Sequence, residues 1–198
     1  MIYNQNLRFA LTKICFLLCC SFATGQNTDT KWYSENKKNG IVIQNSFPKG
    51  GPYTGPTNAH FNYSYLVFFT RIVNETEHLI ELKIRFSADS IAIPNSPNTF
   101  VKVFLPPDTM TLDKQHVFSY GITRLASFDK PTSFNSIIPP GEDALFYTAA
   151  IFYQTTDNFL SEERGGNRAE FIFDGKDLVF NMRPQIDSLP CGHIIFKK

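Results

Sequence analysis

Strict alternation of apolar and charged residues over residues 79–86 constrains the fold of this chain more than any other feature. Four apolar side chains alternate there with three charged ones, in the order Ile80, Glu81, Leu82, Lys83, Ile84, Arg85 and Phe86. A β-strand places successive side chains on opposite faces, whereas a helix with about 3.6 residues per turn cannot separate these two groups. The segment is therefore predicted to be a strand with one face in a core and the other in water.

The preceding segment, residues 63–73, is almost continuously apolar. A run of this kind is typical of a strand that is buried on both faces. Five polar residues, 74–78, separate it from the alternating strand. Two strands joined by so short a connection are predicted to form an antiparallel hairpin.

Shorter apolar runs indicate further strands. They cover Ile41–Ile43, Phe100–Leu105, Leu145–Tyr153, Ala169–Phe173, Leu178–Met182 and Ile194–Phe196. The pair Asp174-Gly175 predicts a tight turn between the fourth and fifth of these strands. Residues 48–56, by contrast, contain three prolines and three glycines, so we expect a surface loop without regular structure there.

Residues 108–128 carry two competing patterns. Phe118 and Ile122 lie four residues apart, as on a helix face, whereas Phe118, Tyr120 and Ile122 also alternate. We favour one short helix, although Gly121 in its middle costs about 1 kcal/mol relative to alanine.

Elsewhere the strands are short and recur without helices between them, which favours two packed antiparallel sheets. The turn Ile138-Pro139-Pro140-Gly141-Glu142 before an apolar strand is similar to turns in immunoglobulin-like domains. We therefore predict a mostly β chain with a single antiparallel β-sandwich of immunoglobulin-like type over residues 40–198. A polar lead-in over residues 26–39 precedes it.

The N-terminus has the order of features found in a cleavable signal peptide. Arg8 and Lys13 precede an apolar run over residues 14–23, and the small residues Ala23 and Gly25 lie at its end. A helix that spans a bilayer needs about 20 apolar residues, so this segment is too short to be a membrane anchor. Cleavage near Gly25 is predicted, and it implies a secreted, periplasmic or cell-envelope protein. The segment resembles the signals of secreted proteins from the Bacteroidota.

A lipid anchor at Cys19 or Cys20 is the competing interpretation. Lipoprotein processing usually requires a small residue directly before the cysteine, and the residue there is Leu18 or Cys19. We therefore favour cleavage and treat these cysteines as apolar members of the signal segment.

Cleavage near Gly25 would leave Cys191 as the only cysteine, so no intramolecular disulfide is expected. It would also leave 17 basic and 18 acidic residues, because Arg8 and Lys13 are lost from the 19 basic residues of the whole chain. A net charge near −1 gives no reason to expect nucleic acid or an anionic membrane as a partner.

Catalytic and metal-binding signatures are absent from the sequence. Cys191 lies beside His193, but nearness in sequence does not supply hydrogen-bond geometry, and we interpret the pair as a buried free thiol and an edge histidine. The histidines, His60, His78, His116 and His193, are isolated from one another, and Asp174 with Asp177 is explained by a turn. No catalytic residue, metal or cofactor is predicted.

Three aromatic residues in predicted loops, Trp32, Tyr33 and Tyr53, are the candidate ligand-binding residues. The leading hypothesis is an exported, non-catalytic binding module with a protein or glycan partner, whose oligomeric state stays open. One alternative is a small extracellular hydrolase whose carboxylates or histidines converge only in the fold. Another is an envelope structural subunit that joins other chains by strand addition.

Overall fold

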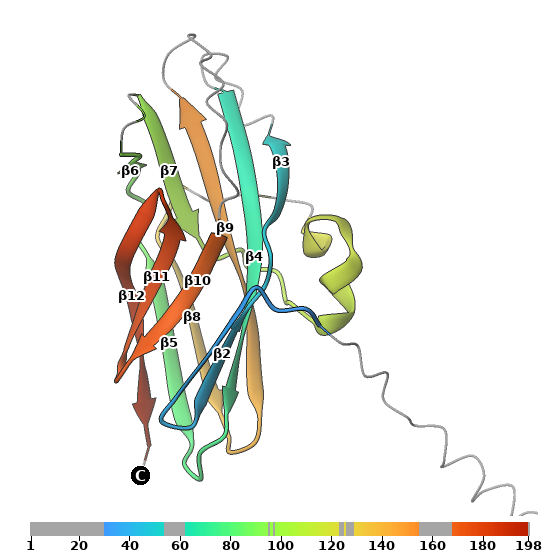
Figure 1. The fold of residues 1–198 in the computed structure, drawn as a ribbon, viewed down its shortest axis with the longest axis vertical. Helices are drawn as coiled ribbons and strands as arrows, with labels where there is room; N and C mark the ends of the chain where they lie inside the picture. Colours follow the sequence, from blue (N-terminus) through green and yellow to red (C-terminus); the bar gives the residue numbers. More distant parts are fainter. Residues whose placement is uncertain are drawn as a thin grey trace, which may run out of the picture.

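The computed structural model describes residues 30–53, 62–94, 96, 98–122, 125, 129–154 and 168–197. The predicted signal peptide, with Cys19 and Cys20, lies outside these residues. In the described residues the strands form two antiparallel sheets that pack face to face, with almost no helix (Figure 1). The predicted mostly β sandwich is therefore confirmed. No helix within the described ranges is long and apolar enough to cross a membrane.

Sheet A has the strand order β1-β2-β4-β9-β7-β6, and β3 pairs with β4 beyond the end of β2. Its strands are β1 (Ser34–Lys38), β2 (Ile41–Asn45), β3 (Lys49–Tyr53), β4 (Asn62–Asn74), β6 (Ile91–Ala92), β7 (Thr99–Phe104) and β9 (Asp143–Gln154). Sheet B has the order β10-β11-β12-β5-β8. Its strands are β5 (Ile80–Phe86), β8 (Thr132–Ile138), β10 (Arg168–Asp174), β11 (Asp177–Arg183) and β12 (Ile186–Phe196).

Strand β4 is buried on both faces, as its apolar sequence predicts. Phe68 and Ile72 belong to the core between the two sheets. Val67 and Phe69 point the other way, into a second core on the outer face of sheet A. This second core is covered by the 3-10 turns η2 (Leu112–His116) and η3 (Phe118–Gly121), which lie on the other side of β4 from sheet B (Figure 1). Sheet A thus has a packed layer on each side.

The predicted hairpin between β4 and β5 is wrong. Strand β4 already has β2 and β3 on one edge and β9 on the other, so β5 crosses to sheet B and pairs with β12 and β8. Asn74 holds this crossing, because its buried amide donates to His78 O at 2.8 Å and to Ile138 O at 2.9 Å. The expected turn at Asp174-Gly175 is confirmed as the β10–β11 hairpin.

The expectation of an irregular loop over residues 48–56 is wrong for Lys49–Tyr53, which forms β3 and pairs with β4 from Lys49↔Val67 to Tyr53↔Tyr63. The proline in this strand is compatible with its position at an edge. Strand β1 lies within the polar lead-in expected over residues 26–39 and pairs with β2.

The helix favoured within residues 108–128 is replaced by the two 3-10 turns in the part that the structure describes. Ser119 and Tyr120 have φ angles of 46° and 54°, and Gly121 follows with 79°. Three consecutive residues in the left-handed region cannot belong to a right-handed helix. Phe118 and Ile122 therefore do not share a helical face.

Candidate binding surface

Ser119 and Tyr120 are the one pair of consecutive non-glycine residues with left-handed backbone among the described residues. Both residues are buried, at 0% and 3% exposure. Each non-glycine residue in this conformation costs on the order of 1–3 kcal/mol, and such a conformation persists only where the surroundings impose it. Strained segments of this kind cluster at functional sites, so the turn is a candidate functional region.

Side chains from sheet A impose the turn through hydrogen bonds. The hydroxyls of Tyr65 and Ser119 share a hydrogen bond of 2.6 Å, and Tyr147 donates to Tyr120 O at 2.7 Å. Tyr120 in turn donates to Phe47 O at 2.6 Å. Burial raises the pKa of Tyr147 to about 12, with Asp108 and Asp113 adding to the rise, so its phenol stays protonated and remains a donor.

Lys49 on β3 fixes the same turn from the other side. Its ammonium donates to Gln115 O at 2.6 Å and to Val117 O at 2.9 Å, and it lies 4.1 Å from the centre of the Tyr120 ring. Partial burial lowers the pKa of Lys49 from its ordinary value. Carbonyl groups and a ring face thus hold this lysine in the turn, where it links η2, η3 and sheet A.

The turn displays apolar side chains to solvent. Phe118 is 76% exposed and Val117 is 47% exposed, and Phe47, whose carbonyl accepts from Tyr120, is 50% exposed. We call Tyr33, Phe47, Val117 and Phe118 the aromatic patch. Exposed apolar side chains on a rigid support are a mark of interaction sites, and aromatic residues dominate the energy of protein interfaces.

Of the residues predicted from sequence, Trp32 and Tyr33 lie at this surface. Tyr33 packs edge-on against Phe47 with ring centres 5.8 Å apart, and the Arg168 guanidinium lies 5.6 Å from its ring centre. Trp32 is half-buried and packs edge-on against Phe69 at 5.4 Å, so it supports the surface from below.

Tyr53 lies elsewhere, in a row of aromatic rings that crosses the far end of sheet A. Tyr53, Tyr63, Tyr153 and Phe100 are directly opposite one another on β3, β4, β9 and β7. Their neighbouring ring centres are 6.1, 5.9 and 5.5 Å apart. Because these rings pack against one another, and Tyr53 also donates to Leu125 O at 3.2 Å, the row stabilises the sheet and is a poor platform for stacking a sugar.

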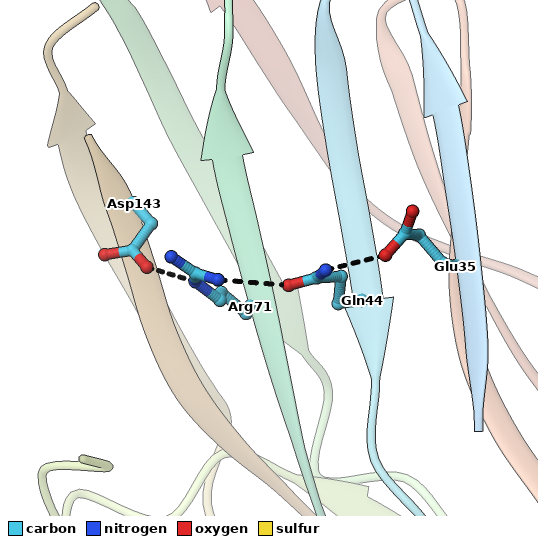
Figure 2. A network of polar contacts seen from close by, with 4 residues as sticks. All are labelled: Glu35, Gln44, Arg71 and Asp143. Carbon is cyan, nitrogen blue, oxygen red and sulfur yellow. Dashed lines mark hydrogen bonds and ion pairs between the residues drawn. The ribbon is translucent and has the colours of Figure 1, made fainter. Parts of the chain in front are cut away.

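A polar ladder crosses the outer face of sheet A (Figure 2). Gln44 donates to Glu35 at 2.6 Å, Arg71 donates to Gln44 at 3.4 Å, and Arg71 forms an ion pair with Asp143. Figure 2 shows these four side chains lying one after another across β1, β2, β4 and β9. Gln44 and Arg71 stand between the two carboxylates, so Glu35 and Asp143 do not form an acid–base pair.

Protein-family models, curated proteins and solved structures give no match to this chain. Within the described residues, no group of three or more histidine, cysteine or acidic side chains is placed to hold a metal ion.

One cleft does collect potential catalytic groups. A cleft of about 470 Å³ between the sheets is lined by residues that include Asp89, Cys191 and His193. Cys191 is buried, its thiol donates to Leu178 O at 3.4 Å, and burial raises the pKa of the thiol to about 12. Although His193 contributes to the lining of this cleft, it lies opposite Lys83 and shares the outward face of sheet B with it, whereas Cys191 belongs to the core between the sheets. The interpretation of Cys191 as a buried free thiol is confirmed, whereas the interpretation of His193 as an edge histidine is wrong, because β12 lies between β11 and β5.

The buried thiol predicts slow alkylation of Cys191. Because the thiolate is the nucleophile and the raised pKa keeps the thiol protonated, iodoacetamide at pH 8 should label Cys191 at least about a hundredfold more slowly in the native chain than in urea. Mass spectrometry of the peptide that contains Cys191 measures the rate. Native labelling as fast as in urea would indicate a reactive cysteine and favour the hydrolase hypothesis.

Sequence reasoning missed Phe47, Val117 and Phe118. A phenylalanine in a β-rich chain is assigned to the core by default, and nothing in the local sequence distinguishes Phe118 from the buried phenylalanines. The two competing patterns around Gly121 are the one sign in the sequence that the backbone of this segment is irregular.

Proposed function

We propose that this chain is an exported, non-catalytic binding module that docks a protein partner through the aromatic patch. The observation that carries the proposal is Phe118, which is 76% exposed on a buried turn of strained backbone. Strain in two consecutive residues reduces stability, and the exposed ring gains no burial in return within the described chain. A partner that covers the ring would recover that burial. Export is supported by the N-terminal signal pattern.

A protein partner is favoured over a glycan by the chemistry of the patch. Sugar stacking uses the open faces of Trp and Tyr rings, and here Trp32 and Tyr53 pack edge-on against Phe69 and Tyr63. The most exposed ring, Phe118, has no hydroxyl to bind a sugar. The polar ladder, from Glu35 to Asp143, adds polar groups to the outer face of sheet A, and polar groups are typical of the rim of a protein interface.

Site-specific photo-crosslinking in the cells that produce the chain tests this function. A photoreactive phenylalanine analogue in place of Phe118 should form one discrete adduct with a different protein. The same analogue at Ile195, which is 38% exposed on sheet B, is the matched control and should form none. Adding Phe47→Ala should lower the yield of the Phe118 adduct at least fivefold.

The variant Phe118→Ala separates binding from folding. Because the ring is exposed, its removal should change the free energy of unfolding by less than about 0.5 kcal/mol, as measured by urea denaturation. Equal crosslinking at positions 118 and 195, or an adduct with glycan alone, would overturn the proposed function.

A further inference from the structure

Strand β8 is an edge of sheet B that lacks the protection found at the other edges. Natural proteins guard edge strands with charges, prolines, short length or covering groups, because open backbone groups recruit other strands. Strand β1 contains Glu35, Lys37 and Lys38, β3 contains Lys49 and Pro52, and β6 is two residues long. Strand β8 has the sequence Thr-Ser-Phe-Asn-Ser-Ile-Ile, seven residues with neither charge nor proline.

The opposite edge of sheet B, strand β10, shows how this protein covers an edge. The side-chain amide of Asn45 donates to Phe171 O at 3.3 Å and accepts from Phe171 N at 3.0 Å, so it pairs with the backbone as a neighbouring strand would. Lys38 and Asp174 form an ion pair at the end of the same edge.

Nothing equivalent covers β8 in the described part of the chain, where its only strand partner is β5. Leu105 N donates to the hydroxyl of Thr132 at the first residue of the strand. Beyond it a groove of about 420 Å³ runs beside the edge, with Phe134, Leu145 and Phe146 among its lining residues. On the outer face Ile137 is 62% exposed.

We infer that β8 pairs with β8 of a second copy of this chain, antiparallel about a twofold axis at Asn135. This register places Ile137 opposite Ser133 and Phe134 opposite Ser136, so each bulky side chain faces a small one. Asn135 faces the same residue of the other copy, where two amides can exchange hydrogen bonds. When a strand pairs with a copy of itself, each charged residue lies near the same charge on the other copy, and the two repel each other. Strand β8 has no charged residue, so this repulsion is absent.

The surroundings limit this dimer in extent and in strength. Pro131 precedes the strand and Pro139-Pro140 follows it, and proline cannot continue a backbone ladder, so pairing ends after seven residues. A stable interface buries about 1,200–2,000 Å², which is more than one pair of short edge strands provides, so we infer a weak, concentration-dependent dimer. The twofold uses each β8 once and therefore closes the assembly. The two copies of sheet B would form one continuous ten-stranded sheet.

Charge-swap variants at Asn135 test the partner and the register together. Asn135 is exposed, so Asn135→Lys and Asn135→Asp should leave the fold intact, which thermal melting verifies. Sedimentation of the purified chain between about 1 and 200 µM should show a monomer–dimer equilibrium. Each variant alone places like charges opposite each other and should weaken the dimer at least tenfold. An equimolar mixture places Lys opposite Asp and should restore association to within about threefold of the original chain.

Either of two other outcomes would overturn the inference. A chain that is monomeric throughout this range would exclude the self-pair and leave the edge to an extended segment of a different protein. A dimer that survives both Asn135 variants but is lost in Phe118→Ala would place self-association at the aromatic patch. Because the β8 inference does not use the aromatic patch, loss of the Phe118 crosslink leaves it unaffected.

Discussion

Replacing Gly50 with alanine is expected to destabilise the fold by about 3 kcal/mol or more, whereas the same change at Gly51 should alter stability by less than about 0.5 kcal/mol. A Cβ atom on Gly50 would overlap the carbonyl oxygen of Tyr65 and press on the backbone of Leu66. A Cβ atom on Gly51 meets no atom within 4 Å. The two glycines are adjacent in β3, so the two variants make the same chemical change in the same strand. They differ in whether the new methyl group meets the backbone of β4.

Equilibrium unfolding in urea measures both variants. Strand β3 must move away from β4 to admit the new methyl group of Gly50→Ala, and Lys49 moves with it. We therefore expect Gly50→Ala to lower the crosslinking yield at Phe118 as well, while Gly51→Ala keeps it. Equal stability of the two variants would show that the β3–β4 contact is looser than the structure indicates.

Replacing Asn45 with alanine is the second change with a large expected effect, a loss of about 3 kcal/mol. The side chain is 1% exposed and pairs with the N–H and C=O groups of Phe171 on β10. Its oxygen also accepts from the Thr70 hydroxyl at 3.1 Å. Alanine would leave these buried groups without partners, and a buried polar group without a hydrogen bond costs about 1–3 kcal/mol.

Gln44→Ala is the matched control for Asn45→Ala. Gln44 is the preceding residue and also makes two side-chain hydrogen bonds, to Glu35 and Arg71, but on the solvent side of sheet A. Exposed polar pairs contribute about 0–1 kcal/mol, so its removal should cost much less. Urea denaturation of both variants makes the comparison. Similar losses for the two would mean that Asn45 does not join the sheets in solution.

The sequence predicts strands well where one physical requirement acts alone. The alternation in β5 and the two-sided apolar run in β4 each reflect burial, and both strands lie where they were expected. The partner of each strand could not be predicted the same way. Strand β4 and strand β5 are joined by a short connection, yet they lie in different sheets because β4 is already paired on both edges.

Strands β3 and β8 lack a periodic signal for separate reasons. In β3 Gly50 permits a close approach to β4, a requirement that becomes visible only once β4 is beside it. In β8 the outward row contains Ile137 and the inward row contains Ser136, so apolar and polar residues do not sort by face. Local propensity predicts neither strand, because the extended conformation of each is determined by pairing with a neighbouring strand.

Of the candidate surface, only Trp32 and Tyr33 could be predicted from the sequence. Trp32 and Tyr33 could be predicted because they are aromatic residues in a polar segment, and in the structure Trp32 packs against Phe69 and Tyr33 against Phe47. The exposure of Phe118 depends on positive φ angles at Ser119 and Tyr120, which neither residue type favours. Tertiary hydrogen bonds from Tyr65 and Tyr147 impose those angles, and no local rule anticipates them.

Because sheet A has a second core on its outer face, the side chains that hold the turn and the side chains that hold the two sheets together form two separate groups. Those that hold the turn, such as Tyr120 and Tyr147, belong to this outer core, whereas Phe171 and Phe180 belong to the core between the sheets. Substitutions that reshape the turn therefore act on one group and leave the other in place.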